Sequence, residues 1–251
     1  MILVTNDDGV ESAGIKGLAA ALETLDSVYV VAPDRERSAI GMAITLHRPL
    51  RAKQVEDRFY AVDGTPVDCV DLAIAQLLPE SPKLVVSGIN HGDNLGHDLH
   101  FSGTVAAARK AALLHIPAIA FSLTSNSMFS NGKYYYETAI KYAVQIVEKA
   151  IEQGIPDGIL LNVNIPNIEV SSVRGIKVTR QDLGTYSANA IERKDRVGNP
   201  YYWIGGERST IDQRPDTDLN TIKDWFVSIT PVQFDQTAHS HLNMIEDWLN
   251  C

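Results

Sequence analysis

Short apolar runs rich in β-branched residues alternate along the chain with longer segments in which apolar residues recur at helical spacing. The short runs predict buried strands, and the longer segments predict amphipathic helices. The predicted strands are residues 2–4, 28–32, 59–62, 84–86, 118–122 and 159–163, and the predicted helices are residues 15–25, 65–78, 105–114 and 134–153. A strand–helix–strand order implies parallel strands joined by right-handed crossovers. The pattern therefore predicts an α/β fold with a mostly parallel sheet.

Two regions depart from this alternation. Residues 34–54 are polar and then strand-like, so we expect an antiparallel excursion beside the strand at residues 59–62. Beyond Pro166, strand-like pieces at residues 175–179, 201–204 and 225–229 alternate with polar loops, and residues 237–249 are helical in pattern. We therefore expect a core over residues 1–166 and a β-rich extension with a C-terminal helix over residues 167–251, acting as one functional unit. A small β-rich extension buries little surface alone, so its arms are expected to pack on a partner subunit.

The first predicted strand ends in two adjacent carboxylates. Residues 2–4 (ILV) are followed by the sequence TNDDG, whose residues favour turns. On a continuing strand Asp7 and Asp8 would point to opposite faces, but Gly9 lets the backbone turn so that both side chains converge. Two like charges at one point bind a hard cation such as Mg²⁺ or Mn²⁺. The alternative is an ordinary polar turn in which Asp8 is solvated.

Other small or oxygen-bearing side chains follow other predicted strands. Ser38 follows the second strand, Asn90 and Asn94 follow the fourth, and residues 102–104 (SGT) open the next helix. The carboxyl ends of parallel strands share one edge of a sheet, so we expect these residues near the acidic pair. Ser38 and Asn90 would complete a hard, open ligand shell, and the helix start would bind a phosphate. Taken singly, the serine is an ordinary helix cap and the asparagines are ordinary turn residues.

Composition narrows the class of partner. The chain has 22 Lys and Arg against 31 Asp and Glu, a net charge of −9, which repels long nucleic acids. No run of about 18 apolar residues is present and Met1 leads straight into a strand, so neither a membrane span nor a signal peptide is expected. Cys69 and Cys251 give no disulfide framework. We therefore expect a cytoplasmic protein that acts on a small anionic molecule.

Six segments in order resemble the signatures of the SurE survival-protein family of metal-dependent 5′/3′-nucleotidases. They are residues 4–9 (VTNDDG), 31–38 (VAPDRERS), 64–69 (GTPVDC), 86–90 (VSGIN), 94–96 (NLG) and 102–105 (SGTV). Residues 202–204 (YWI) and 227–231 (VSITP) extend the similarity to the C-terminal region. The resemblance implies a Rossmann-like, three-layer α/β/α catalytic core and a homodimer or homotetramer with exchanged C-terminal arms.

The resemblance also implies what the site does. It implies removal of phosphate from nucleoside 5′- and 3′-monophosphates with one Mg²⁺ or Mn²⁺ per subunit, and it leaves polyphosphate cleavage open. The metal-activated water would attack phosphorus directly, with Asp7 or Asp8 accepting its proton. The implied metal ligands are Asp7, Asp8, Ser38 and Asn90, and we expect the phosphate to be held by Asn94, Ser102, Gly103 and Thr104. Many members of the family have Pro where this chain has Asp93, so we expect a more mobile loop with an added negative charge.

Two other classes of protein, a covalent phosphatase and a signalling receiver module, fit the sequence less well. A covalent phosphatase needs a nucleophilic Asp two residues before an acidic or hydroxyl partner, which residues 7–10 lack, and Ser38 has no nucleophile-elbow sequence around it. A signalling receiver module needs a phosphorylatable Asp after its third strand and a Lys after its fifth. The strands at residues 84–86 and 118–122 do not end in those residues.

Two further clusters of polar residues have less specific interpretations. His91, His97 and His100 invite a zinc interpretation, but no Cys or helical pair completes a zinc pattern, so surface or rim histidines are favoured, with His91 or His100 near the substrate. Asp212, Asp216 and Asp218 are expected to form a solvated acidic loop, with calcium binding as the less favoured alternative.

Overall fold

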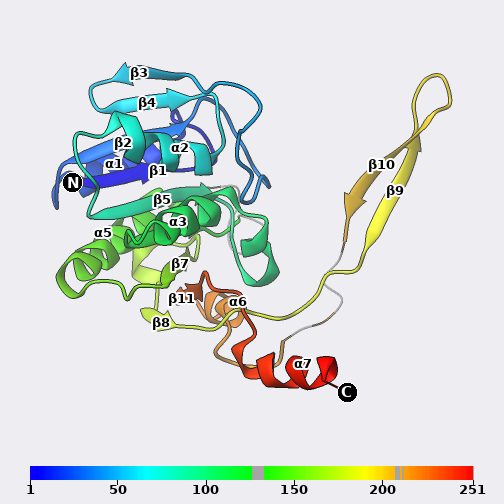
Figure 1. Ribbon diagram of the computed structural model, residues 1–251. Coiled ribbons are helices and arrows are strands. Elements are labelled where there is room, and N and C mark those ends of the chain that lie inside the picture. Colours follow the sequence, from blue (N-terminus) through cyan, green and yellow to red (C-terminus); the bar gives the residue numbers. More distant parts are fainter. Residues whose placement is uncertain (126–132, 207–209, 211, 251) are drawn as a thin grey trace.

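A nine-stranded mixed sheet forms the centre of the computed structural model, which describes residues 1–125, 133–206, 210 and 212–250 (Figure 1). The strand order is β3-β4-β2-β1-β5-β6-β7-β11-β8. The six strands from β4 to β7 are parallel, whereas β3 and β11 run antiparallel to β4 and β7. The strands of this sheet are β1 (Ile2–Thr5), β2 (Val28–Pro33), β3 (Ala52–Glu56), β4 (Phe59–Val62), β5 (Leu84–His91), β6 (Ala118–Leu123), β7 (Ile159–Ile165), β8 (Ile176–Val178) and β11 (Val227–Gln233).

Helices cover both faces of this sheet. Helices α1 (Ala13–Leu22) and α5 (Tyr136–Gln153) pack on one face, and α2 (Pro66–Leu72) and α3 (Gly103–Leu113) pack on the other. Alternate residues of β1 serve the two layers, because Ile2 and Val4 join the first apolar cluster and Leu3 joins the second. The predicted three-layer α/β/α arrangement with a mostly parallel sheet is therefore confirmed.

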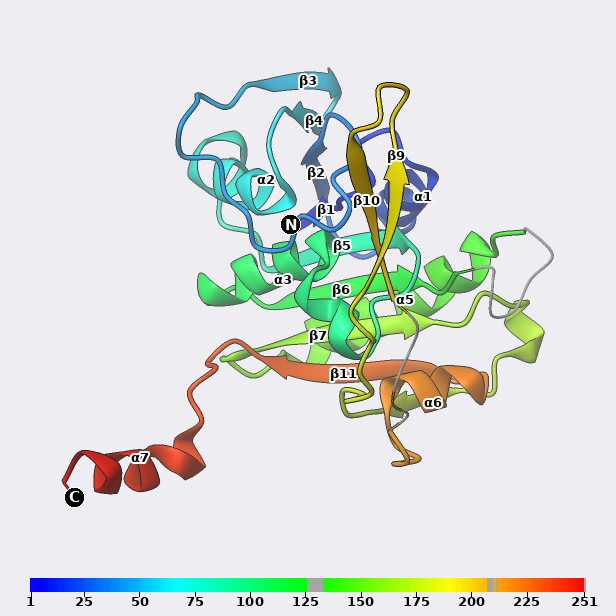
Figure 2. The same ribbon diagram turned by 90° about the vertical axis from the view of Figure 1, so that its right-hand side faces the viewer.

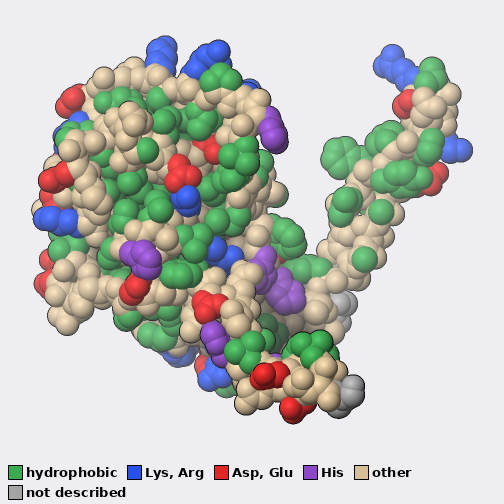
Figure 3. All heavy atoms as spheres, in the orientation of Figure 1, with side chains coloured by type: hydrophobic (Ala, Val, Ile, Leu, Met, Phe, Trp, Pro, Cys, Tyr) green, Lys and Arg blue, Asp and Glu red, His purple; other side chains and the backbone are tan. Residues whose placement is uncertain are grey.

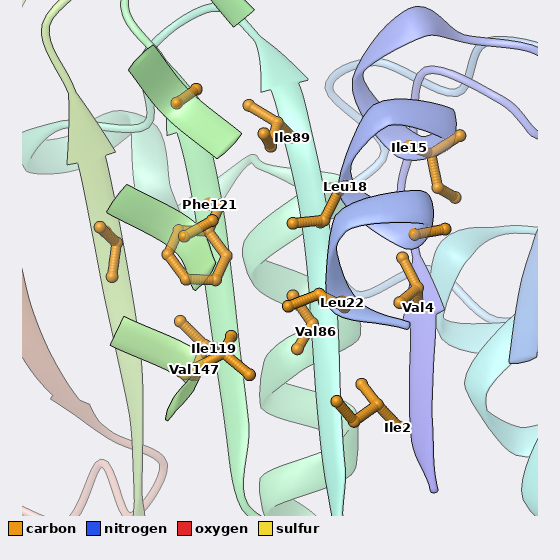
Figure 4. Close-up of a cluster of buried hydrophobic side chains, with 14 of the residues drawn as sticks. Ile2, Val4, Ile15, Leu18, Leu22, Val86, Ile89, Ile119, Phe121 and Val147 are labelled. Carbon is orange, nitrogen blue, oxygen red and sulfur yellow. The ribbon is translucent and has the colours of Figure 1, made fainter. Parts of the chain in front are cut away.

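The first of the two clusters is shown in Figure 4. Leu18 and Leu22 of α1 face Val86 of β5, and Phe121 and Ile119 of β6 lie beside Val147 of α5. These side chains are fully or almost fully buried. The helical spacing of apolar residues in α1 thus has the tertiary partner that the sequence predicts.

The C-terminal third adds two sheet strands and two projecting pieces. Strands β11 and β8 extend the main sheet beyond β7, and helix α6 (Asp218–Lys223) packs beside them. Strands β9 (Asn189–Lys194) and β10 (Pro200–Gly205) form a separate antiparallel hairpin that projects from the body (Figure 1), and α7 (Leu242–Leu249) projects from it as well (Figure 2). The domain boundary expected at residue 166 stays a prediction, although β8 and β11 share the sheet of the core.

Most predicted elements are present, with small shifts at their ends. The antiparallel excursion is β3 with β4. The sequence analysis did not predict β9, α6 or the 3₁₀ helix at Gly96–His100, which are short, and β9 is exposed on both faces. The strand expected from residue 225 begins at Val227, because Trp225 has a positive φ of 66°.

The structure also bears on Asp218, on the two cysteines and on the expected absence of a membrane span. The solvated acidic loop is wrong for Asp218, which is fully buried at the start of α6. Cys69 is a free, buried thiol, and Cys251 lies outside the described residues. No helix in the described ranges is both long enough and apolar enough to cross a membrane.

Replacing Leu18 by Ala tests the packing of α1 on the sheet. The Leu18 side chain is fully buried, so its truncation leaves a cavity and should lower the free energy of unfolding by about 2–5 kcal/mol. The matched control is Leu113→Ala in α3, where the side chain is 44% exposed and the change should stay near 0.5 kcal/mol. Urea unfolding followed by circular dichroism measures both, and equal losses would contradict the packing described here.

Candidate active site

The loop after β1 makes a tight, self-supporting turn. The Asn6 side chain donates to the carbonyl oxygen of Gly9 at 2.9 Å and accepts from the N–H of Gly9 at 3.1 Å. Gly9 itself has a φ of +97°, which a residue with a side chain adopts only with strain. The predicted role of Gly9 in turning the chain is therefore confirmed, and Asp7 and Asp8 lie at the carboxyl end of the strand.

Asp7 is a buried carboxylate at the start of α3. Its Oδ1 accepts a hydrogen bond from the hydroxyl of Thr104. Gly103 packs against it so closely that a Cβ at position 103 would lie 2.8 Å from the Asp7 Cβ. Burial raises the pKa of Asp7 from 3.8 to about 6, the Thr104 hydrogen bond opposes that rise, and the nearby charge of Asp8 adds to it. Without a bound cation, the pocket thus disfavours the ionised form of Asp7.

Asp8 is half-buried and faces the end of β5. Its Oδ2 accepts a hydrogen bond from the backbone N–H of His91 at 3.0 Å. Burial raises the pKa of Asp8, the His91 N–H lowers it, and the charge of Glu36 raises it. The first and fifth strands are therefore joined at this edge by a carboxylate.

Ser38 lies in an exposed turn after β2 and is not part of a helix, so its interpretation as a helix cap is wrong. The N–H of Arg37 donates to the carbonyl oxygen of Asp7 at 2.7 Å, which fixes this turn beside the acidic loop. The Ser38 hydroxyl donates to Glu36 at 2.7 Å. The hydroxyl oxygen still has lone pairs for another partner.

Asn90 is presented by an irregularity in β5. The register between β5 and β6 shifts between Ser87 and Asn90, which re-aims the end of the strand. The Asn90 amide nitrogen donates to the carbonyl oxygen of Gly92 at 2.8 Å. Among the described residues, no donor is hydrogen-bonded to its amide oxygen, which is the atom that a cation would use.

One cavity of about 290 Å³ brings most of the predicted residues together. It is bounded by Asp7, Ser38, Ala39, Asn90, His91, Gly92, Asp93, Asn94, Asp98, Phe101 and Ser102. Asp8, Gly103 and Thr104 do not bound it and stand behind Asp7 or His91. Two carboxylates, a hydroxyl and an amide oxygen are the donor set of a hard divalent cation, and neither carboxylate forms an ion pair with a described residue.

The N-terminus of α3 closes the cavity on the phosphate-binding side expected from the sequence. The Ser102 hydroxyl caps the helix by accepting from the N–H of Val105 at 3.1 Å. The backbone N–H of Thr104 is hydrogen-bonded to Asp7, and the N–H of Gly103 lies beside it in the first turn of the helix. Helix N–H groups of this kind bind anions. The Thr104 side chain was expected on the phosphate but holds Asp7 instead.

Asn94 is fixed by polar side chains that the sequence analysis did not single out. Its side chain donates to the Ser122 hydroxyl at 2.7 Å, and its N–H donates to Asn164 at 2.9 Å. The amides of Asn162 and Asn164 both donate to the Asn94 carbonyl oxygen. The signal that could have found them is the sequence NVN at residues 162–164, which places two polar residues on one side of an otherwise apolar strand.

The loop around Asp93 is tied down rather than loose. The Asp93 carboxylate accepts a hydrogen bond from the N–H of Ser125 at 3.0 Å, just beyond the end of β6. The expected extra mobility of this loop therefore has no support in these contacts. Asp93 does add a negative charge to the cavity wall, as the sequence predicts.

The histidines do not form a metal site. His91 lines the cavity and packs edge-on against Tyr134, with 3.9 Å between ring centroids. The rings of His97 and His100 lie 6.3 Å apart, and His100 lines a separate cleft of about 690 Å³ beside Arg109. Within the described ranges, no group of three or more His, Cys, Asp or Glu residues is arranged to hold a metal ion, so the zinc interpretation has no support.

The sequence and the fold of this chain are similar to those of known proteins. The family model "Survival protein SurE" matches residues 2–188. The chain is 46% identical over 248 residues to the 5′-nucleotidase SurE of Pelobacter propionicus, covering 99% of each chain. It is also 46% identical over 250 residues to that of Myxococcus xanthus, covering 98% of this chain and 92% of the other. The crystal structure of the SurE protein from Aquifex aeolicus superposes with a TM-score of 0.88 at 40% identity and covers 100% of this chain and 99% of that one. The chain therefore belongs to the SurE survival-protein family.

Proposed function

We propose that this chain is a nucleotidase that hydrolyses the phosphomonoester of nucleoside 5′- and 3′-monophosphates to a nucleoside and phosphate. The observation that carries the proposal is the cavity in which Asp7, Ser38 and Asn90 face the N-terminus of α3. Relatives named 5′-nucleotidase SurE support the choice of a nucleotide as substrate. We also propose that the same site cleaves polyphosphate as a side activity.

We infer that Asp7, Asp8, Ser38 and Asn90 hold one divalent cation, Mg²⁺ or Mn²⁺. The buried carboxylate of Asp7 and the amide oxygen of Asn90 are the donors that fit it best, because neither has a charged partner among the described residues. When bound, such a cation lowers the pKa of a water molecule and neutralises charge on the phosphate. Asp7 or Asp8 takes the proton that the attacking water loses.

The phosphate is held at the start of α3. The N–H of Gly103 and the hydroxyl of Ser102 donate to its oxygens, where the transition state spreads negative charge, while Thr104 holds the Asp7 carboxylate beside them. Asn94, which also bounds the cavity, adds to this set. In the hydrolysis, the bond from the water oxygen to phosphorus forms as the bond to the ribose oxygen breaks, and these donors keep the phosphoryl group in line.

We also propose a cytoplasmic homodimer or homotetramer in which C-terminal arms are exchanged. The projecting hairpin and α7 carry large apolar side chains in contact with solvent, as Figure 3 shows for the hairpin. Trp203, Ile204 and Leu249 are 65%, 93% and 82% exposed. Apolar surface of this extent supports burial against a second copy of the chain.

A screen of phosphate release tests the reaction and its metal requirement. Nucleoside 5′- and 3′-monophosphates are incubated with the protein, with and without EDTA, and inorganic phosphate is measured. We expect release from nucleotides that EDTA abolishes and that excess Mg²⁺ or Mn²⁺ restores. Full activity in EDTA would contradict the metal site.

The substitution Asp8→Asn tests the acidic pair. It removes one negative charge from the cation site, so kcat/KM for a nucleoside monophosphate should fall by about 10³-fold or more, while the circular dichroism spectrum stays unchanged. The control is Asp57→Asn, whose side chain is 89% exposed and distant from the cavity. Near-normal turnover by the Asp8 variant would contradict its role.

The substitution Asp7→Asn tests the electrostatic cost of the buried carboxylate. The folded pKa of about 6 lies above the ordinary 3.8, so the metal-free protein loses stability as pH rises from about 4 through 6. The full effect is about 3 kcal/mol. In EDTA, Asp7→Asn should therefore melt several degrees above the unsubstituted protein at pH 7.5 and close to it at pH 4.

Adding Mg²⁺ supplies the matched control for that measurement. Mg²⁺ should raise the melting temperature of the unsubstituted protein and leave that of Asp7→Asn almost unchanged, because the variant lacks a carboxylate ligand. A metal-free Asp7→Asn protein that melts below the unsubstituted protein at pH 7.5 would refute the argument.

A further inference from the structure

The loop from residue 92 to residue 101 carries Asn94 and leads into α3. The centre of this loop is hydrogen-bonded to residues of the C-terminal third. The N–H of Gly96 donates to Oδ2 of Asp218 at 2.9 Å, and the side chain of Gln181 donates to the carbonyl oxygen of Gly96 at 3.0 Å. Gly96 has a φ of +54°, and a Cβ there would lie 3.0 Å from the carbonyl oxygen of Asp182. Both polar groups of Gly96 are thus held by residues far away in sequence.

Asp218 is the residue that joins this loop to the C-terminal third. It is fully buried in the first turn of α6, and its carboxylate accepts three backbone N–H groups. These donors are Gly96 at 2.9 Å, Asp182 at 3.0 Å and Leu219 at 2.7 Å. Burial raises the pKa of Asp218, the three N–H groups lower it, and the charge of Asp182 raises it. A buried carboxylate joins three separate stretches of backbone here, which an apolar residue could not do.

Apolar contacts hold the same loop in place. Leu95 packs with Leu219 and Ile222 of α6 in an apolar cluster that is separate from the two main ones. All three side chains are buried. Asn94, Leu95 and Gly96 are therefore consecutive residues that face, in turn, the cavity wall, the α6 cluster and the Asp218 carboxylate.

The neighbouring residue Asn94 has no freedom of its own. Its backbone and amide nitrogen are bonded to Ser122, Asn162 and Asn164 at the ends of β6 and β7. A shift of Gly96 would strain those bonds and move the wall that faces α3. We propose that Asp218 is a positioning residue, whose carboxylate fixes Gly96 and thereby sets Asn94 at the distance from α3 that the phosphate requires. The proposal rests on the nucleotidase function proposed above.

The test compares Asp218→Asn with Asp224→Asn. An Asn side chain places an NH₂ group against a backbone donor, so at least one of the three bonds is lost. Asp224 is exposed at the end of the same helix, and its substitution makes the same charge change without touching the loop. Assays are run well below each variant's melting temperature.

We expect Asp218→Asn to lower kcat/KM for a nucleoside monophosphate by about 10- to 100-fold, because small displacements of positioning groups cost that much. Affinity for inorganic phosphate, measured by calorimetry in Mg²⁺, should fall in parallel. The rise in melting temperature on adding Mg²⁺ should be kept, because Asp7, Asp8 and Ser38 lie on other loops. Amide hydrogen exchange should speed up over residues 94–98. Asp224→Asn should change none of these.

Other outcomes separate this inference from the function on which it rests. If the unsubstituted protein releases no phosphate, the proposed function fails. Hydrogen exchange then still tests whether the Asp218 carboxylate holds the backbone of Gly96. If it is active and Asp218→Asn keeps normal kcat/KM and phosphate affinity despite a lower melting temperature, Asp218 is only structural and the inference is overturned.

A second variant covers the case in which Asp218→Asn does not fold. Gln181→Met removes the hydrogen bond to the Gly96 carbonyl oxygen and a contact with His100 Nε2 at 3.2 Å, from a side chain that is not fully buried. The loss of one such bond should lower phosphate affinity by roughly 5-fold. Unchanged affinity in Gln181→Met would then overturn the inference.

Discussion

The candidate active site depends on one unfavourable interaction, the burial of the Asp7 carboxylate without a cationic side chain beside it. An ionised carboxylate loses several kcal/mol of solvation on burial unless charge or hydrogen bonds replace the water. The hydroxyl and the backbone N–H of Thr104 both lower the pKa of Asp7, yet burial still raises it to about 6. Gly103 is required because any side chain there would collide with Asp7. The surrounding residues thus hold an unbalanced negative charge in place, and the cation that we propose at this site would balance it.

The topology explains why this charge lies where it does. The chain places β2 on one side of β1 and β5 on the other, so the strand order reverses at β1. At such a reversal the loops after neighbouring strands diverge and leave a crevice at their carboxyl ends. Asp7 follows β1, Ser38 follows β2 and Asn90 ends β5, which accounts for their common cavity. The order of the strands therefore sets where the cavity lies, and the side chains at the strand ends set what it can bind.

The sequence predicts those parts of the site that depend on local structure. The turn at Gly9 and the helix start at residues 102–104 follow from residue types within a few positions, and the structure confirms both. The direction of the Asn90 side chain could not be predicted from the sequence, because it depends on a shift in the register between β5 and β6. The buried Asp218 was taken for a solvated residue, because its three hydrogen-bond donors include Gly96, which is 122 residues away. Periodicity and turn chemistry carry no information about such contacts.

The same long-range contacts change the meaning of the C-terminal third. From sequence it was an extension for assembly, yet α6 and the segment after β8 enclose the loop that carries Asn94. Asp218 lies beyond residue 188, where the family-model match ends, but within the 99% of the chain that aligns with the Pelobacter propionicus relative. The two ends of the chain therefore meet at this edge of the sheet, because residues after β8 hold the backbone of the loop that joins β5 to α3.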